Sequence, residues 1–142
     1  MDKLTAHSGL VLCGEFFHSI ALSHLLNNHL PKPKNSLGYS PSEFGLHLLL
    51  TLHGGGHKID DIRMIRHDTG LCELLSFKEI PSSHAYGDWL LRHGRDQQSL
   101  LGLEKINQTL IRRQLNSEEF QGYTLDIDAS QIVAEKKTAK MT

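Results

Sequence analysis

The spacing of apolar residues changes once along this chain, and that change limits what it can fold into. Up to about residue 115, apolar side chains recur every three or four residues, the period of a helix with one buried face. Between Tyr123 and Ser130 the period becomes two, because Leu125 and Ile127 alternate with Asp126 and Asp128. Side chains two apart on a strand point the same way, so this segment is predicted to have one apolar and one polar face. The sequence therefore predicts a mainly helical region followed by a first strand or hairpin.

Start and stop signals divide the helical region into separate elements. Ser40-Pro41-Ser42-Glu43 joins a capping serine, a proline at the first helical position and a glutamate that can answer the cap. Gly54-Gly55-Gly56 supplies the left-handed backbone that a helix end needs. Residues 71–75 are predicted to run into a turn. Five helices are expected before residue 120, over residues 8–30, 40–52, 59–66, 82–93 and 100–115.

Composition excludes several classes of protein. The 142 residues carry a formal net charge of -1, so DNA binding would have to come from a local cationic patch. Cys13 and Cys72 stand far apart without CxxC spacing, which favours neither a zinc site nor a disulfide framework. Glu15 and His18 interrupt the apolar stretch near the N-terminus before it could form a signal peptide or membrane span. We expect a cytoplasmic protein with no membrane partner.

The polar face of the predicted strand is the strongest chemical signal. Asp126 and Asp128 would project from it together, as carboxylates that hold a hard divalent cation do. Mg²⁺ takes only one or two carboxylates plus water and phosphate oxygens, so a complete site needs ligands from elsewhere. The alternative is that both aspartates are ordinary solvent-facing residues of an amphipathic strand.

Residues 123–130 and the following Glu135-Lys136-Lys137-Thr138-Ala139-Lys140 resemble the first catalytic strand of bacterial insertion-sequence transposases of the DDE superfamily, group 1. Three upstream segments fall in the order typical of that group, and the resemblance covers almost the entire chain. These segments are Tyr39-Ser40-Pro41-Ser42-Glu43, Gly54-Gly55 with Ile59-Asp60-Asp61-Ile62-Arg63, and Leu74 to Pro81-Ser82-Ser83.

The resemblance implies an RNase H-like α/β fold in which two aspartates and a glutamate bind two Mg²⁺ ions for DNA strand cleavage and transfer. Asp128 matches the first of the three carboxylates, and Asp126 is the second choice. Residues 1–120 then correspond to a helical region for DNA binding or dimerisation, and residues 121–142 to the start of an incomplete, truncated catalytic domain. We expect a fragment that is inactive alone, whose full-length form is a homodimer acting on terminal inverted repeats and target DNA.

The DNA-binding candidates are arginines on predicted helices, because guanidinium groups contact phosphates bidentately. Arg63 and Arg66 lie in one helix and Arg112 and Arg113 in another. The alternative for each is a solvated helix face. Residues 41–66 have the order of a helix-turn-helix, but Asp60 and Asp61 at the leading end of the second helix favour a plain helical hairpin.

A second function from another class stays open. The chain can be a small, self-sufficient helical module for binding DNA or protein, with an incidental C-terminal strand. The histidines, among them His24, His29, His84 and His93, lack metal-ligand spacing and are interpreted as surface or satisfied core residues.

Overall fold

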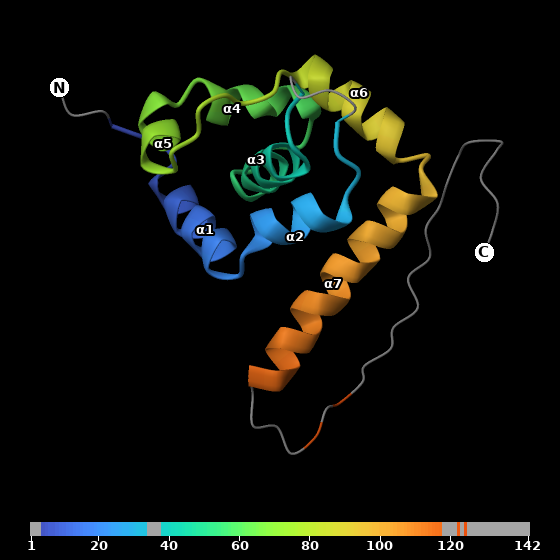
Figure 1. Cartoon of the computed structure of the whole chain (residues 1–142). Helices are drawn as coiled ribbons and strands as arrows, with labels where there is room; N and C mark the ends of the chain where they lie inside the picture. Colours follow the sequence, from blue (N-terminus) through green and yellow to red (C-terminus); the bar gives the residue numbers. More distant parts are fainter. Residues whose placement is uncertain (1–3, 34–37, 118–121, 123, 125–142) are drawn as a thin grey trace.

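The computed structural model describes residues 4–33, 38–117, 122 and 124 (Figure 1). The described part is mainly helical, with seven α-helices and one 3₁₀ turn. In chain order they are α1 (Ser8–Ser19), α2 (Leu22–His29), α3 (Pro41–His53), η1 (Ile59–Asp61), α4 (Ile62–Arg66), α5 (Thr69–Leu74), α6 (Ser83–His93) and α7 (Gln97–Ser117).

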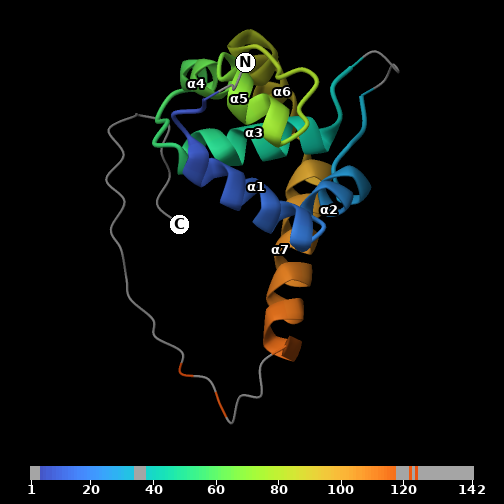
Figure 2. The same ribbon diagram turned by 90° about the vertical axis from the view of Figure 1, so that its left-hand side faces the viewer.

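Helix α3 lies at the centre of the molecule, and the other helices surround it. It contacts α1, α2 and α4, while α7 packs along α2 and extends beyond the rest of the body (Figures 1 and 2). One cluster of buried apolar side chains fills the space between these helices, and such burial stabilises a fold by about 25 cal/mol per Å² of apolar surface. Its members are Leu10, Phe17, Leu22, Leu25, Leu26, Leu30, Phe44, Leu50, Ile62, Ile65, Leu71, Ile80, Tyr86 and Ile106.

Both ends of α3 form as the sequence predicts. The Ser40 side chain accepts a hydrogen bond from the Glu43 amide, and the Glu43 carboxylate accepts one from the Ser40 amide at 2.6 Å. At the other end Gly55 adopts a φ of 88°, and the Gly56 amide donates to the Thr51 carbonyl at 2.9 Å. This hydrogen bond closes the end of the helix and requires a left-handed backbone at Gly55, the residue after the C-cap. Glycine adopts that conformation without strain because it has no Cβ.

The expectation of one helix over residues 8–30 is wrong. Ala21 adopts a left-handed conformation, with φ 53° and ψ 39°, and separates α1 from α2. The apolar spacing continues across this break because Phe17 and Leu22 are both buried in the same core. The apolar periodicity therefore predicted helical structure on both sides of Ala21 correctly, but it did not indicate the bend between the two helices.

The sequence prediction also contains no helix over residues 69–74, where the structure has α5. The turn into which residues 71–75 were expected to run follows at Leu75 and Ser76. The Asp68 side chain caps the helix by accepting the Leu71 amide at 2.9 Å. Ser76 ends it with a φ of 57°, and the Phe77 amide donates to the Cys72 carbonyl at 2.8 Å. With these two additions the described residues contain seven α-helices where five were expected.

The last two helices follow the sequence prediction closely. Ser82 caps α6 by accepting the Ala85 amide, and Gly94 follows its last turn. On α6 the Trp89 ring stacks on Phe44, with centroids 4.9 Å apart, and the Tyr86 hydroxyl donates to the Phe44 carbonyl at 3.0 Å. These contacts fix α6 to α3.

The predicted strand over residues 123–130 lies outside the described residues except for Thr124. Among the helices that are described, none is by itself long and apolar enough to cross a membrane. Helices α1 and α2, which meet at 61°, satisfy that criterion only when they are taken together.

Candidate nucleic-acid interface

The two predicted catalytic aspartates, Asp126 and Asp128, lie outside the described residues. Within residues 4–33 and 38–117, no group of three histidine, cysteine or acidic side chains is placed to hold a metal ion. The four arginines predicted to bind DNA lie among the described residues, and their positions can be examined.

Helix α4 carries two of the predicted DNA-binding arginines on its outward side. Ile62 and Ile65 are buried in the core, which leaves Arg63 and Arg66 exposed. The Arg63 guanidinium lies 3.5 Å from the Asp60 carboxylate, and both side chains are largely exposed. An exposed ion pair of this kind contributes little stability and is easily exchanged for a phosphate contact.

Asp61 holds the loop that leads into this helix. Its carboxylate accepts the amides of His57 at 2.7 Å and Lys58 at 2.9 Å. These two hydrogen bonds lower the pKa of Asp61, because they favour the charged form. Asp61 therefore has a local structural role: it fixes the backbone of His57 and Lys58 at the start of η1, while the Lys58 side chain is exposed.

The length of α4 bears on the helix-turn-helix hypothesis. Its five residues span only roughly 7.5 Å at about 1.5 Å per residue, and a 3₁₀ turn precedes it. A recognition helix has to present several side chains along the major groove. The geometry of residues 41–66 therefore favours the plain helical hairpin, in which α4 can contact phosphates without reading bases.

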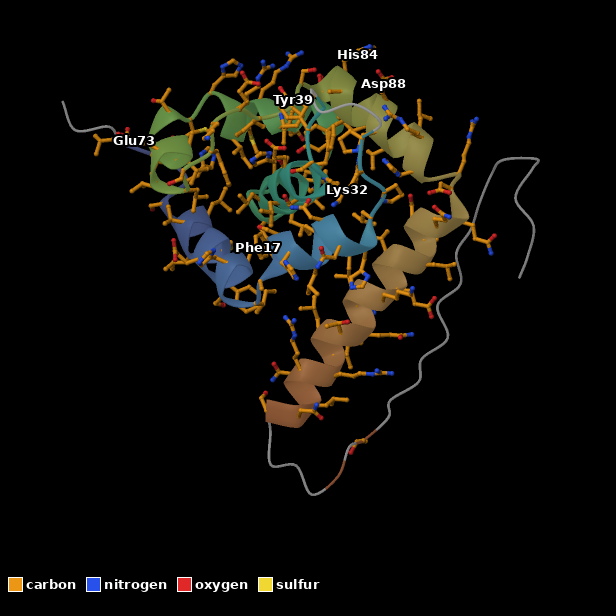
Figure 3. The ribbon with its side chains drawn as sticks, viewed as in Figure 1. Phe17, Lys32, Tyr39, Glu73, His84 and Asp88 are labelled. Carbon is orange, nitrogen blue, oxygen red and sulfur yellow. The ribbon has the colours of Figure 1, made fainter. Side chains whose placement is uncertain are left out.

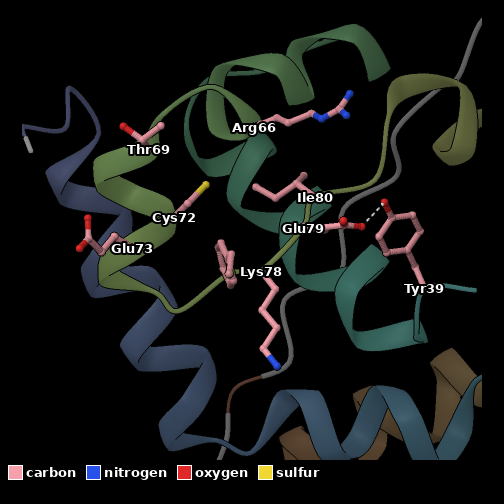
Figure 4. A pocket seen from close by; sticks show the side chains of 9 residues that line it. Tyr39, Arg66, Thr69, Cys72, Glu73, Lys78, Glu79 and Ile80 are labelled. Carbon is pink, nitrogen blue, oxygen red and sulfur yellow. Dashed lines mark hydrogen bonds between the residues drawn. The ribbon is translucent and has the colours of Figure 1, made fainter. Parts of the chain in front are cut away.

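A cavity of about 510 Å³ opens beside Arg66 (Figure 4). At the rim of the cavity the Tyr39 hydroxyl donates to the Glu79 carboxylate at 3.2 Å. Burial is the main cause that raises the pKa of Tyr39, and this hydrogen bond raises it further. The cavity is lined by Tyr39, Arg66, Thr69, Cys72, Glu73, Phe77, Lys78, Glu79 and Ile80. Because two cations and two carboxylates share this lining, it suits a polar group with both donors and acceptors better than a bare phosphate.

The other two predicted arginines lie on α7 and are not equivalent. The Arg113 guanidinium donates to the Ile20 carbonyl at 2.8 Å and so ties α7 to the bend between α1 and α2. Arg112 is exposed. Helices α4 and α7 lie on opposite sides of the body (Figures 1 and 2), so the structure does not bring the four arginines into one patch.

The N-terminal segment is joined to α5 by a polar cluster. The Asp68 carboxylate accepts the Thr5 hydroxyl at 2.6 Å and lies 3.0 Å from His7 Nδ1. The same carboxylate group caps α5 through the Leu71 amide. In some enzymes an aspartate orients a histidine that acts as a general base. Here the contacts of Asp68 connect the segment before α1 to the start of α5, which is a structural role.

His47 is a residue that the sequence interpretation missed. It is 2% exposed, its Nδ1 has no hydrogen-bond partner among the described residues, and its ring meets Phe77 edge-on at 4.4 Å. Burial lowers its pKa to about 4, so the ring is neutral at pH 7. The sequence could have indicated this burial, because His47 lies three residues from both Phe44 and Leu50 and therefore on the same buried face of α3.

Comparison with known proteins adds no relative: no family model, curated protein or solved structure matches this chain. The function must therefore be inferred from the residues themselves.

Proposed function

We propose that this chain is the N-terminal part of a DDE transposase, which cleaves DNA at element ends and transfers the strands to a target. One observation carries the proposal: the alternating segment with Asp126 and Asp128 follows a helical region whose motifs stand in the order typical of that group. In support, two of those motifs contain the helix caps Ser40 and Ser82.

In this proposal residues 121–142 begin an RNase H-like domain, and Asp128, with Asp126 as the second choice, is its first metal ligand. Two bound Mg²⁺ ions would stabilise the attacking and leaving oxygens during strand cleavage and transfer. The remaining carboxylates have to come from a longer polypeptide, so the 142 residues alone are expected to be inactive.

The helical body would supply contacts to the DNA backbone through the α4 side of the molecule. Lys58, Arg63 and Arg66 lie there within nine residues, with Asp61 engaged by backbone amides. Cations in such an arrangement bind phosphates without sequence preference and lose affinity as salt rises.

The catalytic part of the proposal is tested on the longest open reading frame that contains this sequence. We expect it to supply a second aspartate and a glutamate, and to cleave DNA carrying the flanking inverted repeats in the presence of Mg²⁺. Asp128→Asn should abolish cleavage and leave repeat binding intact. A reading frame without further carboxylates, or full cleavage by the variant, would refute the assignment.

The DNA-binding part is tested with this chain and a fluorescent duplex. Lys58→Glu with Arg66→Glu should weaken binding by about tenfold or more and flatten its dependence on salt. Arg92→Glu with Arg95→Glu makes the same change of net charge at the C-terminal end of α6 and serves as the control. Equal losses in both pairs would show that only net charge matters and would remove α4 as the interface.

The alternative, a self-sufficient helical interaction module, is favoured by one observation: in the described part of the chain, the buried apolar core is formed by residues between Leu10 and Ile106. Such a module would bind its partner without metal and without any longer reading frame. Sequence-specific duplex binding by the 142 residues alone, at physiological salt, would support this alternative over the transposase.

A further inference from the structure

Another cavity, of about 420 Å³, lies where α6 meets the start of α3 and the residues that follow α2. Tyr39 and Asp88, two of its lining residues, lie at the same end of the molecule (Figure 3). Most of the lining consists of ring side chains. We name the cavity the Trp89 groove, and its lining includes Pro31, Pro33, Tyr39, Asp88, Trp89 and Arg92.

Trp89 brings an unused hydrogen-bond donor to this groove. Its indole stacks on Phe44, with centroids 4.9 Å apart and planes 11° apart, so the orientation of the ring is fixed. Within the described residues the Trp89 Nε1–H donates no hydrogen bond. Among the described residues that are not exposed, His47 Nδ1 is the only side-chain nitrogen or oxygen that is both buried and unpaired. The Trp89 Nε1–H therefore reaches solvent and can donate to a ligand.

Arg92 adds further donors to the lining. Its guanidinium is exposed and makes no hydrogen bond or ion pair in the part of the chain that the structure describes. The Asp88 carboxylate, in contrast, lies 3.6 Å from His84 Nε2, and the Tyr39 hydroxyl donates to Glu79. The unused polar groups of the groove are therefore mainly donors, which suits a ligand rich in carbonyl acceptors.

The chain places its own proline segment against the same rings. Leu30 has an extended backbone, with φ -98° and ψ 149°, and Pro31-Lys32-Pro33 follows. Proline fixes its own φ and restricts the residue before it to extended conformations, so this segment favours polyproline II. Because Pro31 and Pro33 line the groove together with Tyr39 and Trp89, this aromatic surface already accommodates proline rings.

We propose that the Trp89 groove binds a proline-rich peptide in the polyproline II conformation. Such a peptide exposes its carbonyl oxygens, and its prolines have no N–H, so it matches a cavity whose unused groups are donors. Aromatic-lined grooves recognise peptides of this kind. The ligand is already ordered before it binds, so it loses little conformational entropy. This inference does not depend on the transposase proposal.

Single-stranded nucleic acid is the competing occupant, because bases also stack on aromatic rings. Grooves that bind it combine such rings with a track of positive charge along the backbone. In the Trp89 groove the Asp88 carboxylate offsets the Arg92 guanidinium, so the charges of the lining favour a neutral peptide.

Fluorescence of Trp89 tests the proposal directly, because the chain has no other tryptophan. An acetylated and amidated peptide of ten prolines, titrated into the 142-residue chain, should shift the emission to saturation. The affinity should depend little on salt, since the peptide carries no charge. A glycine–serine peptide of the same length is the control probe and should cause no shift.

Two variants locate the contacts. Arg92→Ala and Trp89→Phe should each raise the dissociation constant about threefold to tenfold, the effect of losing one hydrogen bond, measured by calorimetry. Phenylalanine keeps a ring that can pack on Phe44, and circular dichroism confirms that the helices remain. Arg95→Ala, at an exposed arginine outside the lining, is the matched control and should leave binding unchanged.

The proposal is overturned if the emission does not saturate at millimolar concentrations of the proline peptide, or if the glycine–serine peptide gives an equal response. It is also overturned if Arg95→Ala weakens binding as much as Arg92→Ala does. A response to a single strand of thymidines, without one to the proline peptide, would assign the groove to base stacking instead.

Discussion

His47 places a buried imidazole in the middle of the central helix, where its charge state affects the whole fold. The ring is 2% exposed, and its Nδ1 has no partner in the described part of the chain. Desolvation is the main reason that the pKa falls to about 4, and the opposing effect of Glu43, which favours the charged ring, is smaller.

The pH dependence of stability follows from that shift. Above about pH 6.5 the ring is neutral in both the folded and the unfolded chain, and the full stability is present. As the pH falls from 6.5 to about 4, the unfolded chain takes up the proton first, so stability is lost. Urea denaturation should show a loss of about 2 kcal/mol between pH 7.5 and pH 5 from this group.

His47→Leu should remove most of that loss, because leucine has a similar volume and no proton to gain. His84→Gln, at an exposed position of α6, serves as the control and should retain the wild-type difference. If His47→Leu lost as much stability between the two pH values as the wild type, a different group would be responsible.

At the scale of the elements, the packing of α7 against α2 depends on one glycine. A Cβ atom built on Gly102 would overlap the carbonyl oxygen of His29 and lie 3.0 Å from its carbonyl carbon. Gly102→Ala should therefore push the helices apart and lower the free energy of unfolding by about 2 kcal/mol, measured in urea. Gly87→Ala is the control on α6, where a Cβ meets nothing within 4 Å, and it should add about 0.5–1 kcal/mol. Equal effects of the two changes would contradict the close approach.

The bend between α1 and α2 is held by an alanine in a conformation that suits glycine. Ala21 has a φ of 53°, which costs an L-residue with a Cβ about 1 kcal/mol. Ala21→Gly should raise the free energy of unfolding by up to about 0.5 kcal/mol, because the relief of strain exceeds the cost of glycine's greater freedom in the unfolded chain only slightly. The thermal midpoint should rise accordingly. Ala85→Gly, inside α6, should lower the free energy of unfolding by about 1 kcal/mol. A loss of stability from Ala21→Gly would show that the bend carries no strain.

These elements show which parts of the fold could be predicted from the sequence. The starts of α3 and α6 were predicted correctly because Ser40 and Ser82 make their capping contacts with residues three positions away. The bend at Ala21 was missed because nothing local favours it: burial of both helices against the same core holds an alanine there. Helix α5 was missed because its six residues are too few to show a helical period, although the turn that ends it at Ser76 was expected.

The candidate site was harder to predict, because it depends on how the helices pack. The exposure of Arg63 and Arg66 follows from the burial of Ile62 and Ile65, which helical spacing indicates. That α4 and α7 lie on opposite sides of the body does not follow from spacing within either helix. The role of Arg113 in binding the Ile20 carbonyl depends on that packing too.

At the scale of the whole molecule, the proposed division of the chain near residue 120 has a consequence for stability. Among the described residues, every buried apolar side chain of the core lies between Leu10 and Ile106, and Leu110 is the last that packs against it. A domain with a complete core of its own can fold without its neighbours. Residues 1–117 should therefore unfold cooperatively by themselves.

Deleting residues 118–142 tests this division. The free energy of unfolding in urea should stay within about 0.5 kcal/mol of the full chain's value, because every core contact of the described residues is kept. Deleting residues 95–142 is the informative contrast: loss of α7 uncovers the α2 surface that Gly102 and Ile106 bury, and cooperative unfolding should be lost. If removal of residues 118–142 alone cost 2 kcal/mol or more, the segment with Asp126 and Asp128 would belong to the helical body. The proposed start of a separate catalytic domain at residue 121 would then be wrong.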